Sequence, residues 1–268
     1  MHQTTSAGSA FRASLDGYAR AGIRHVEITL PIIAEFLKTA SVADAKRMMT
    51  DLGLTAVSFG GVRGLAEPHP GRAQALEDLK RTAGLVAELG IDRLVCPCGT
   101  TEKFTIDDYA RGAENLREAG EVVKPFGVTA MLEFMRGSTF VGTLPTALRL
   151  TRQAAHPNVR PMFDCYHFWA GLSKFEDLEL IQNGEIHHVH FQDVPDIPRE
   201  QLDNTTREIP GDGVSPLVRI LSKLAEKNYR GPVSVELFYP RLQNGDPHEV
   251  ALQIRRKAEP ILQQAGVL

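Results

Sequence analysis

Segments with strand character and segments with helix character alternate along nearly the whole chain, and this alternation limits the fold most strongly. Seven short runs rich in Val, Ile, Leu, Met and Phe are typical of buried strands, and longer stretches with helical periodicity separate them. The predicted strands cover residues 24–30, 54–59, 92–96, 128–134, 159–164, 186–191 and 233–238. The predicted helices cover residues 11–21, 42–52, 73–89, 106–125, 144–155, 175–182, 215–227 and 247–264. Such alternation predicts an α/β fold with a parallel sheet.

Short turns with glycine lead from helix to strand at Gly22, Gly53, Gly90 and Gly127. The chain has 268 residues, which is an ordinary length for one barrel of eight βα units. We therefore predict one domain over residues 1–268, folded as a TIM (β/α)8 barrel. Because the predicted helices outnumber the strands by one, and an open barrel would expose strand edges, we expect a short or clipped first strand at the N-terminus.

Composition excludes several classes of partner. The formal net charge of −3 and the pI near 6.3 offer neither a basic field for nucleic acid nor a polybasic face for a membrane. The start of the chain lacks an export signal, and no run of apolar residues is long enough to span a bilayer. The three cysteines Cys96, Cys98 and Cys165 match no common disulfide or zinc spacing. We expect a cytoplasmic protein with no nucleic-acid or membrane partner, and a homo-oligomer is compatible with the sequence.

Four predicted strands each carry an ionisable residue near the carboxyl end: Glu133, Asp164, His190 and Glu236. An isolated charge inside an apolar strand is costly, so something must compensate it. The carboxyl ends of the strands in a parallel barrel converge on one mouth, where four such groups could surround a single divalent cation. A single glutamate at a strand end is more often a solvated residue of the rim, but four in register favour a metal site.

Three segments carry a resemblance to a known family: FDCYHF, HVHFQD followed by REIPGDG, and SVELFYP. They resemble the xylose-isomerase-like superfamily of TIM barrels that act on sugars, especially 2-keto-myo-inositol isomerase and related isomerases and epimerases. The similarity runs from about residue 24 to the C-terminus. It implies metal ligands of the types Glu, Asp, His and Glu on the last four strands, which correspond here to Glu133, Asp164, His190 and Glu236. The loop at residues 60–70 matches no relative closely enough to name a sugar.

A site of three carboxylates and one imidazole favours one divalent ion, with Mn²⁺ preferred and Mg²⁺, Co²⁺ or Zn²⁺ tolerated. Such an ion can stabilise the enediolate that forms when a proton leaves the carbon next to a ketone. We expect Glu133 and Glu236 to act as the acid and base as well as ligands. The expected substrate is a small sugar or cyclitol ketone.

Four further residues are expected to contact substrate. His167 follows Asp164 by three residues, although helix capping or packing would explain it equally well. Arg207 offers planar paired donors for substrate oxygens, or it forms a surface ion pair with Glu208 or Asp212. Asp193 could orient a ligand histidine, bind the metal directly as substrate enters, or simply cap its loop. Glu27 points toward the mouth by strand alternation.

The sequence thus predicts a metal-dependent isomerase or epimerase that acts through an enediolate. The nearest alternative is a dehydratase of the inosose or 3-dehydroshikimate type, which shares the enediolate but expels a hydroxyl group. An apurinic-site endonuclease would need a cationic DNA groove, which the composition does not provide. A binding subunit with a vestigial site is a fourth reading, and four intact ligand types argue against it.

Overall fold

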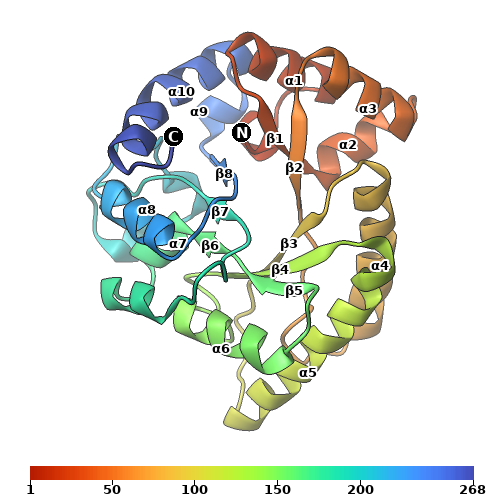
Figure 1. The fold of residues 1–268 in the computed structure, drawn as a ribbon, viewed down its shortest axis with the longest axis vertical. Coiled ribbons are helices and arrows are strands. Elements are labelled where there is room, and N and C mark those ends of the chain that lie inside the picture. Colours follow the sequence, from red (N-terminus) through yellow and green to blue (C-terminus); the bar gives the residue numbers. More distant parts are fainter.

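The computed structural model describes residues 1–268 and shows a ring of parallel strands surrounded by helices (Figure 1). One five-stranded sheet has the order β1-β2-β3-β4-β5, and one three-stranded sheet has the order β6-β7-β8. The strands are β1 (His25–Thr29), β2 (Thr55–Gly60), β3 (Arg93–Cys98), β4 (Thr129–Phe134), β5 (Val159–Pro161), β6 (Phe163–Asp164), β7 (Val189–His190) and β8 (Val233–Ser234). All neighbouring strands pair in parallel, which confirms the predicted barrel.

β5 and β6 occupy one barrel position and join the two sheets. Only Met162 separates them, and its N–H donates to Leu132 O on the β4 side at 3.1 Å. The next residue, Phe163, donates its N–H to His188 O on the β7 side at 3.0 Å. The predicted strand at residues 159–164 is therefore a single strand that changes partners halfway along.

The first strand is present and very short. His2 pairs in parallel with Glu27 of β1, and its N–H donates to Val235 O beyond β8 at 3.1 Å. Glu27 N–H donates to Met1 O at 2.8 Å, so Met1 and His2 lie between β8 and β1. This arrangement confirms the short first strand expected from the unequal numbers of helices and strands.

The helices surround the barrel in the predicted order. Seven of the predicted segments form α1 (Phe11–Arg20), α3 (Val42–Asp51), α4 (Arg72–Glu88), α5 (Ile106–Val123), α6 (Leu144–Ala154), α8 (Leu217–Glu226) and α10 (Pro247–Gln264). The eighth, predicted at 175–182, is instead the 3-10 helix η3 (Phe175–Leu180), whose last turn ends where Ile181 returns to extended backbone. Capping boxes at Ser41 with Asp44 and at Thr105 with Asp108 fix the starts of α3 and α5.

Three additional α-helices are present: α2 (Leu30–Phe36) and α7 (Cys165–Ala170) follow directly after strands, and α9 (Pro240–Gln243) lies in the loop after β8. Short 3-10 helices fill several connections: η1 (Gln3–Ser6), η2 (Lys124–Phe126), η4 (Arg199–Gln201) and η5 (Asn204–Thr206). The sequence pattern did not separate α2 and α7 because their apolar residues continue the apolar run of the preceding strand.

A cluster of 63 buried apolar residues fills the space between the strands and the helices. Inside the barrel, Val95, Met131 and Met162 form a separate small apolar layer. Two residues further along β4 and β6, on the same strand face, lie Glu133 and Asp164. The apolar layer is therefore the floor of a polar mouth at the carboxyl ends of the strands.

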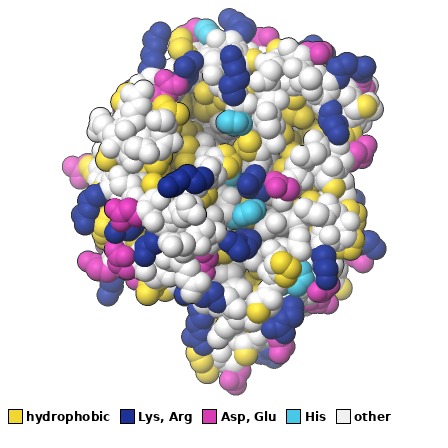
Figure 2. All heavy atoms as spheres, in the orientation of Figure 1, with side chains coloured by type: hydrophobic (Ala, Val, Ile, Leu, Met, Phe, Trp, Pro, Cys, Tyr) yellow, Lys and Arg dark blue, Asp and Glu magenta, His cyan; other side chains and the backbone are white.

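The surface carries charges of both signs. On the face drawn in Figure 2, Lys and Arg side chains are interspersed with Asp and Glu, and a few histidines lie near the middle. No helix has the combined length and apolarity needed to cross a membrane.

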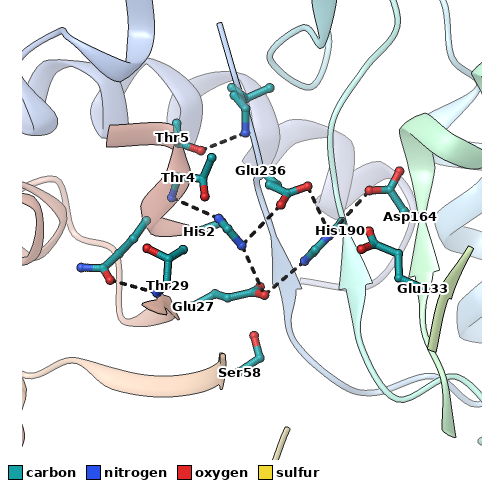
Figure 3. A network of polar contacts seen from close by, with 12 residues as sticks. His2, Thr4, Thr5, Glu27, Thr29, Ser58, Glu133, Asp164, His190 and Glu236 are labelled. Atoms are coloured by element: carbon teal, nitrogen blue, oxygen red, sulfur yellow. Dashed lines mark hydrogen bonds and ion pairs between the residues drawn. The ribbon is translucent and has the colours of Figure 1, made fainter. Parts of the chain in front are cut away.

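Thr5 joins the N-terminal segment to β8, and this contact yields a stability prediction. Its hydroxyl donates to Val235 O at 3.0 Å and accepts from Leu237 N–H at 3.0 Å (Figure 3). Thr5→Val keeps the shape but leaves the Leu237 N–H without its partner, so we expect the free energy of unfolding to fall by about 1–3 kcal/mol. Urea denaturation measures this change. Thr4→Val is the matched control and should leave stability almost unchanged, whereas an equal loss in both variants would contradict the role of the Thr5 hydroxyl.

Candidate functional site

The four predicted metal ligands meet at the mouth of the barrel (Figure 3). One donor atom from each of Glu133, Asp164, His190 and Glu236 lies within 4.8 Å of the others, and all four side chains are buried. His190 Nδ1 lies 3.2 Å from Glu133 Oε1, 3.4 Å from Glu236 Oε2 and 3.5 Å from Asp164 Oδ2. Strands β4, β6 and β7 each end at one of these residues or one position beyond it, and Glu236 follows β8. The parallel barrel thus brings together residues that are up to 103 positions apart.

The three carboxylates place a concentration of negative charge in a buried space. Burial raises the pKa of Glu133 to about 7, and the imidazole of His190 opposes this rise. Burial would lower the pKa of His190, but the charges of Glu236 and Glu27 hold it well above its usual value. Burial would also raise the pKa of Asp164, yet His167 and Arg207 hold it far below its usual range. His190 thus carries a proton that it must release to bind a metal.

The donor set fits a divalent cation. Carboxylate oxygens are hard ligands, and a neutral imidazole nitrogen completes a mixed oxygen and nitrogen set suited to Mn²⁺, Mg²⁺, Co²⁺ or Zn²⁺. Three buried carboxylates within reach of one point repel each other unless a positive charge lies between them. Both observations favour a metal-binding role for the cluster.

Arg207 lies against this cluster and is only 2% exposed. Its Nη1 donates to Glu236 Oε2 at 2.5 Å and lies 3.4 Å from Asp164 Oδ2. The guanidinium carbon also lies over the rings of Tyr166 and Phe238, at 4.9 Å from each centroid. The alternative of a surface ion pair with Glu208 or Asp212 is therefore wrong, because the loop turns the side chain inward.

His167 faces Arg207 from α7. Its Nε2 lies 3.1 Å from Arg207 Nη2, and its Nδ1 accepts from the Arg136 N–H at 3.3 Å. Burial lowers the pKa of His167 to about 4, so the ring is neutral at physiological pH and has one N–H. A neutral ring accepts at one nitrogen only, so either Arg207 or the Arg136 N–H donates to it. The Nε of Arg207 is a buried donor without a partner within the protein.

Asp193 has a different place from the one predicted. Its Oδ2 accepts from the N–H groups of Gly211 and Gly213 at 3.0 and 3.1 Å, and its Oδ1 accepts from Val194 and Ser215 at 2.8 and 2.9 Å. Four backbone donors occupy the carboxylate, so the structure leaves it no free acceptor for substrate and no contact with His190. Asp193 caps its loop, the alternative that the sequence had left open.

Glu27 also differs from the sequence expectation, because it has no exposed surface for a substrate to reach. Its Oε2 lies 2.8 Å from His188 Nε2, and its Oε1 lies 3.2 Å from His190 Nε2 and 3.5 Å from His2 Nε2. Burial would raise the pKa of Glu27, but the imidazoles of His2, His190 and His188 hold it well below its usual value. Glu27 is therefore a buried anion beside the ligand cluster.

Sequence reasoning missed the part played by His2 and Gln192. The Nε2 of His2 lies 3.4 Å from Glu236 Oε1, and Gln192 Nε2 donates to Asp164 Oδ2 at 2.7 Å. His2 precedes the first segment with recognisable periodicity, so no pattern in the sequence marked it. Alternation from His190 could have indicated that Gln192 faces the mouth.

A cavity of about 760 Å³ lies elsewhere. It is bounded by the residues that lead into β1 and β8 and by residues of α8 and α10, and its lining is mainly apolar. None of the four candidate ligands lines it. Polar donors converge only at the opposite end of the barrel, where the carboxyl ends of the strands meet.

Comparison with known proteins agrees with this architecture. The chain matches the family described as xylose isomerase-like TIM barrel over residues 15–258. It is 31% identical to an inosose isomerase of Halalkalibacterium halodurans, over 88% of this chain and 86% of that protein. It is 26% identical to a 3-dehydroshikimate dehydratase of Pseudomonas putida, over 88% of this chain but 37% of that protein.

Solved structures show the same fold. A crystal structure described as IOLI protein with a binding zinc atom superimposes with a TM-score of 0.92 at 23% identity, covering 99% of this chain and 98% of that one. D-psicose 3-epimerase from Clostridium cellulolyticum H10, in complex with D-tagatose, gives a TM-score of 0.72 at 20% identity, covering 96% and 93%. On the match that extends over most of its length, the chain belongs to the xylose isomerase-like TIM barrel family.

Proposed function

We propose that the protein is a divalent-metal-dependent isomerase or epimerase whose substrate is inosose or a related small sugar ketone. The observation that carries this proposal is the convergence of Glu133, Asp164, His190 and Glu236 at the mouth of the barrel. Four curated relatives named inosose isomerase, at 28 to 31% identity, support the choice of substrate. The donor set favours Mn²⁺, although a structural neighbour holds zinc.

A dehydratase is the second candidate. Relatives named 3-dehydroshikimate dehydratase and inosose dehydratase share the scaffold at 26 to 28% identity. Both reactions begin with removal of a proton beside a ketone, and the dehydratase then expels a hydroxyl group. The products differ by one water molecule, so their masses distinguish the two reactions.

Within this proposal, Glu133 and Glu236 move the proton. They reach the cluster from β4 and from the segment after β8, so they flank a bound substrate on separate sides. A bound cation would stabilise negative charge on neighbouring substrate oxygens. Glu133 has a pKa raised to about 7, near the pH at which a general acid or base is most effective.

His167 and Arg207 would bind a substrate oxygen. Arg207 has a buried Nε donor without an acceptor in the protein, and such a donor can stabilise an oxygen that becomes more negative during the reaction. Contacts with His167, Tyr166 and Phe238 hold the guanidinium in place beside the cluster.

The first prediction concerns the metal. Purified wild-type protein should bind about one Mn²⁺ per chain, and His190→Ala should weaken binding roughly tenfold or more. Glu133, whose pKa is raised to about 7, and His190, whose pKa is raised, must both lose a proton, so the apparent affinity should increase as the pH rises through about 7. Isothermal titration measures both effects. His248→Ala is the control, since Asp246, His248 and Glu249 form a second cluster of ionisable groups on the surface; loss of Mn²⁺ in that variant alone would place the cation there.

The second prediction tests the reaction. Wild-type protein with Mn²⁺ in D₂O should introduce deuterium into inosose or its isomer, and the product should keep the mass of an isomer. Glu133→Gln and Glu236→Gln keep a coordinating oxygen but lose the base, so turnover should fall by about 10²-fold or more at matched metal occupancy. One variant can still exchange a substrate proton while failing to form product. Mass spectrometry and NMR measure deuterium exchange and product formation. A product lighter by one water would identify the dehydratase instead.

The third prediction concerns Arg207. Arg207→Lys keeps the charge but loses the planar pair of donors, so kcat/KM should fall by about 10²-fold while Mn²⁺ stoichiometry is retained. Arg199→Lys, in the same loop but outside the cluster, is the control for a general disturbance of the loop. Equal kcat/KM in wild type and Arg207→Lys would exclude a role in substrate binding.

A further inference from the structure

We propose that Glu27 is a positioning residue that fixes the orientation of His190, so that Nδ1 of the imidazole faces the ligand cluster. This inference rests on the proposed metal site, and it assigns Glu27 a function different from the substrate contact that the sequence suggested. It also assigns to Glu27 the task that the sequence had offered to Asp193.

The two nitrogens of His190 have separate partners (Figure 3). Nδ1 faces the carboxylates of Glu133, Asp164 and Glu236 at 3.2 to 3.5 Å. Nε2 lies 3.2 Å from Glu27 Oε1 on the opposite side of the ring. A neutral imidazole has one N–H, and an ionised carboxylate can only accept. Carboxylates face both nitrogens, so a metal bound at Nδ1 would leave the single proton on Nε2, where Glu27 accepts it.

Glu27 is itself held in place. Its second oxygen lies 2.8 Å from His188 Nε2, which also contacts Ser58 Oγ at 3.2 Å. The side chain comes from the centre of β1, where the main-chain N–H is bonded to Met1 O. Both carboxylate oxygens thus have partners on rigid strands, and the acceptor for His190 cannot rotate away without losing them.

The neighbouring rings restrain His190 without selecting one of its two flipped positions. His2 and His188 pack against it edge to face, with centroids 5.4 and 5.5 Å away and interplanar angles of 84° and 86°. Such packing fixes the ring plane, but the terminal torsion of histidine is broad and roughly twofold. The hydrogen bond to Glu27 is the contact that distinguishes the two nitrogens.

Glu27→Gln tests this role because it keeps the size of the side chain. The amide must present its oxygen to one histidine and its NH₂ group to the other, so one of the two hydrogen bonds is lost. We expect the affinity for Mn²⁺, measured by titration of the metal-stripped protein, to fall roughly 10 to 100-fold. Glu121→Gln is the matched control: it makes the same change in a Glu–His pair outside this network, where Glu121 Oε1 lies 3.0 Å from His156 Nε2, and its variant should bind Mn²⁺ like wild type.

A second measurement needs no variant. In the Zn²⁺-loaded wild-type protein, long-range ¹H–¹⁵N correlation spectra of labelled histidine should show His190 with its proton on Nε2 and its metal on Nδ1. A proton on Nδ1, or unchanged Mn²⁺ affinity in a folded Glu27→Gln protein, would overturn the proposal. If wild type itself binds neither Mn²⁺ nor Zn²⁺, the proposed metal-dependent function fails together with this inference. A metal-binding wild type that lacks isomerase activity would overturn the proposed function alone.

Discussion

The buried carboxylates of Glu133, Asp164 and Glu236 are the constraint on which the rest of the site depends. A carboxylate removed from water is stable only when positive charge or hydrogen-bond donors surround it, and here one oxygen from each of the three lies within 4.8 Å of the others. Arg207 compensates one side of the cluster and His190 lies in the middle of it. A divalent cation would complete this compensation. The same cation would stabilise negative charge on substrate oxygens during the proposed reaction.

The barrel meets this requirement through strand register. Asp164 pairs with His190 across β6 and β7, and Glu133 pairs with Pro97 across β3 and β4. Because the side chains of a strand alternate between its two faces, a shift of one residue would turn a ligand into the helix layer. The apolar floor of Val95, Met131 and Met162 helps to hold this register, since it fills the interior two residues below. Packing inside the barrel thus positions the polar mouth.

Strands and the ionisable residues near their ends could be predicted from local periodicity. The roles of residues whose partners lie in distant segments could not. The strands that end at Glu133, Asp164 and His190 could be recognised because each is an apolar run with one ionisable residue. Asp193 and Glu27 could not be assigned in the same way. Three of the four backbone donors to Asp193 lie 18 to 22 residues away in the folded loop, and the partners of Glu27 lie up to 163 residues away. Contacts between residues so far apart in the sequence cannot be recognised from the local pattern of apolar and polar residues.

The candidate site is easier to identify from the sequence than the substrate, because different parts of the fold carry the two. The proposed metal ligands lie on strands or directly after them, in a register fixed by the barrel, whereas Arg207 and His167 lie on a loop and on a short helix that follow the strands. Loops and short segments of this kind vary among proteins that share one scaffold, and they determine which ketone fits and where an acid can reach a leaving group. His2 departs from this division, because it lies in the short first strand and still contacts both Glu27 and Glu236. His2, which helps to close the barrel between β8 and β1, therefore also helps to hold these carboxylates, on which metal binding and proton transfer would depend.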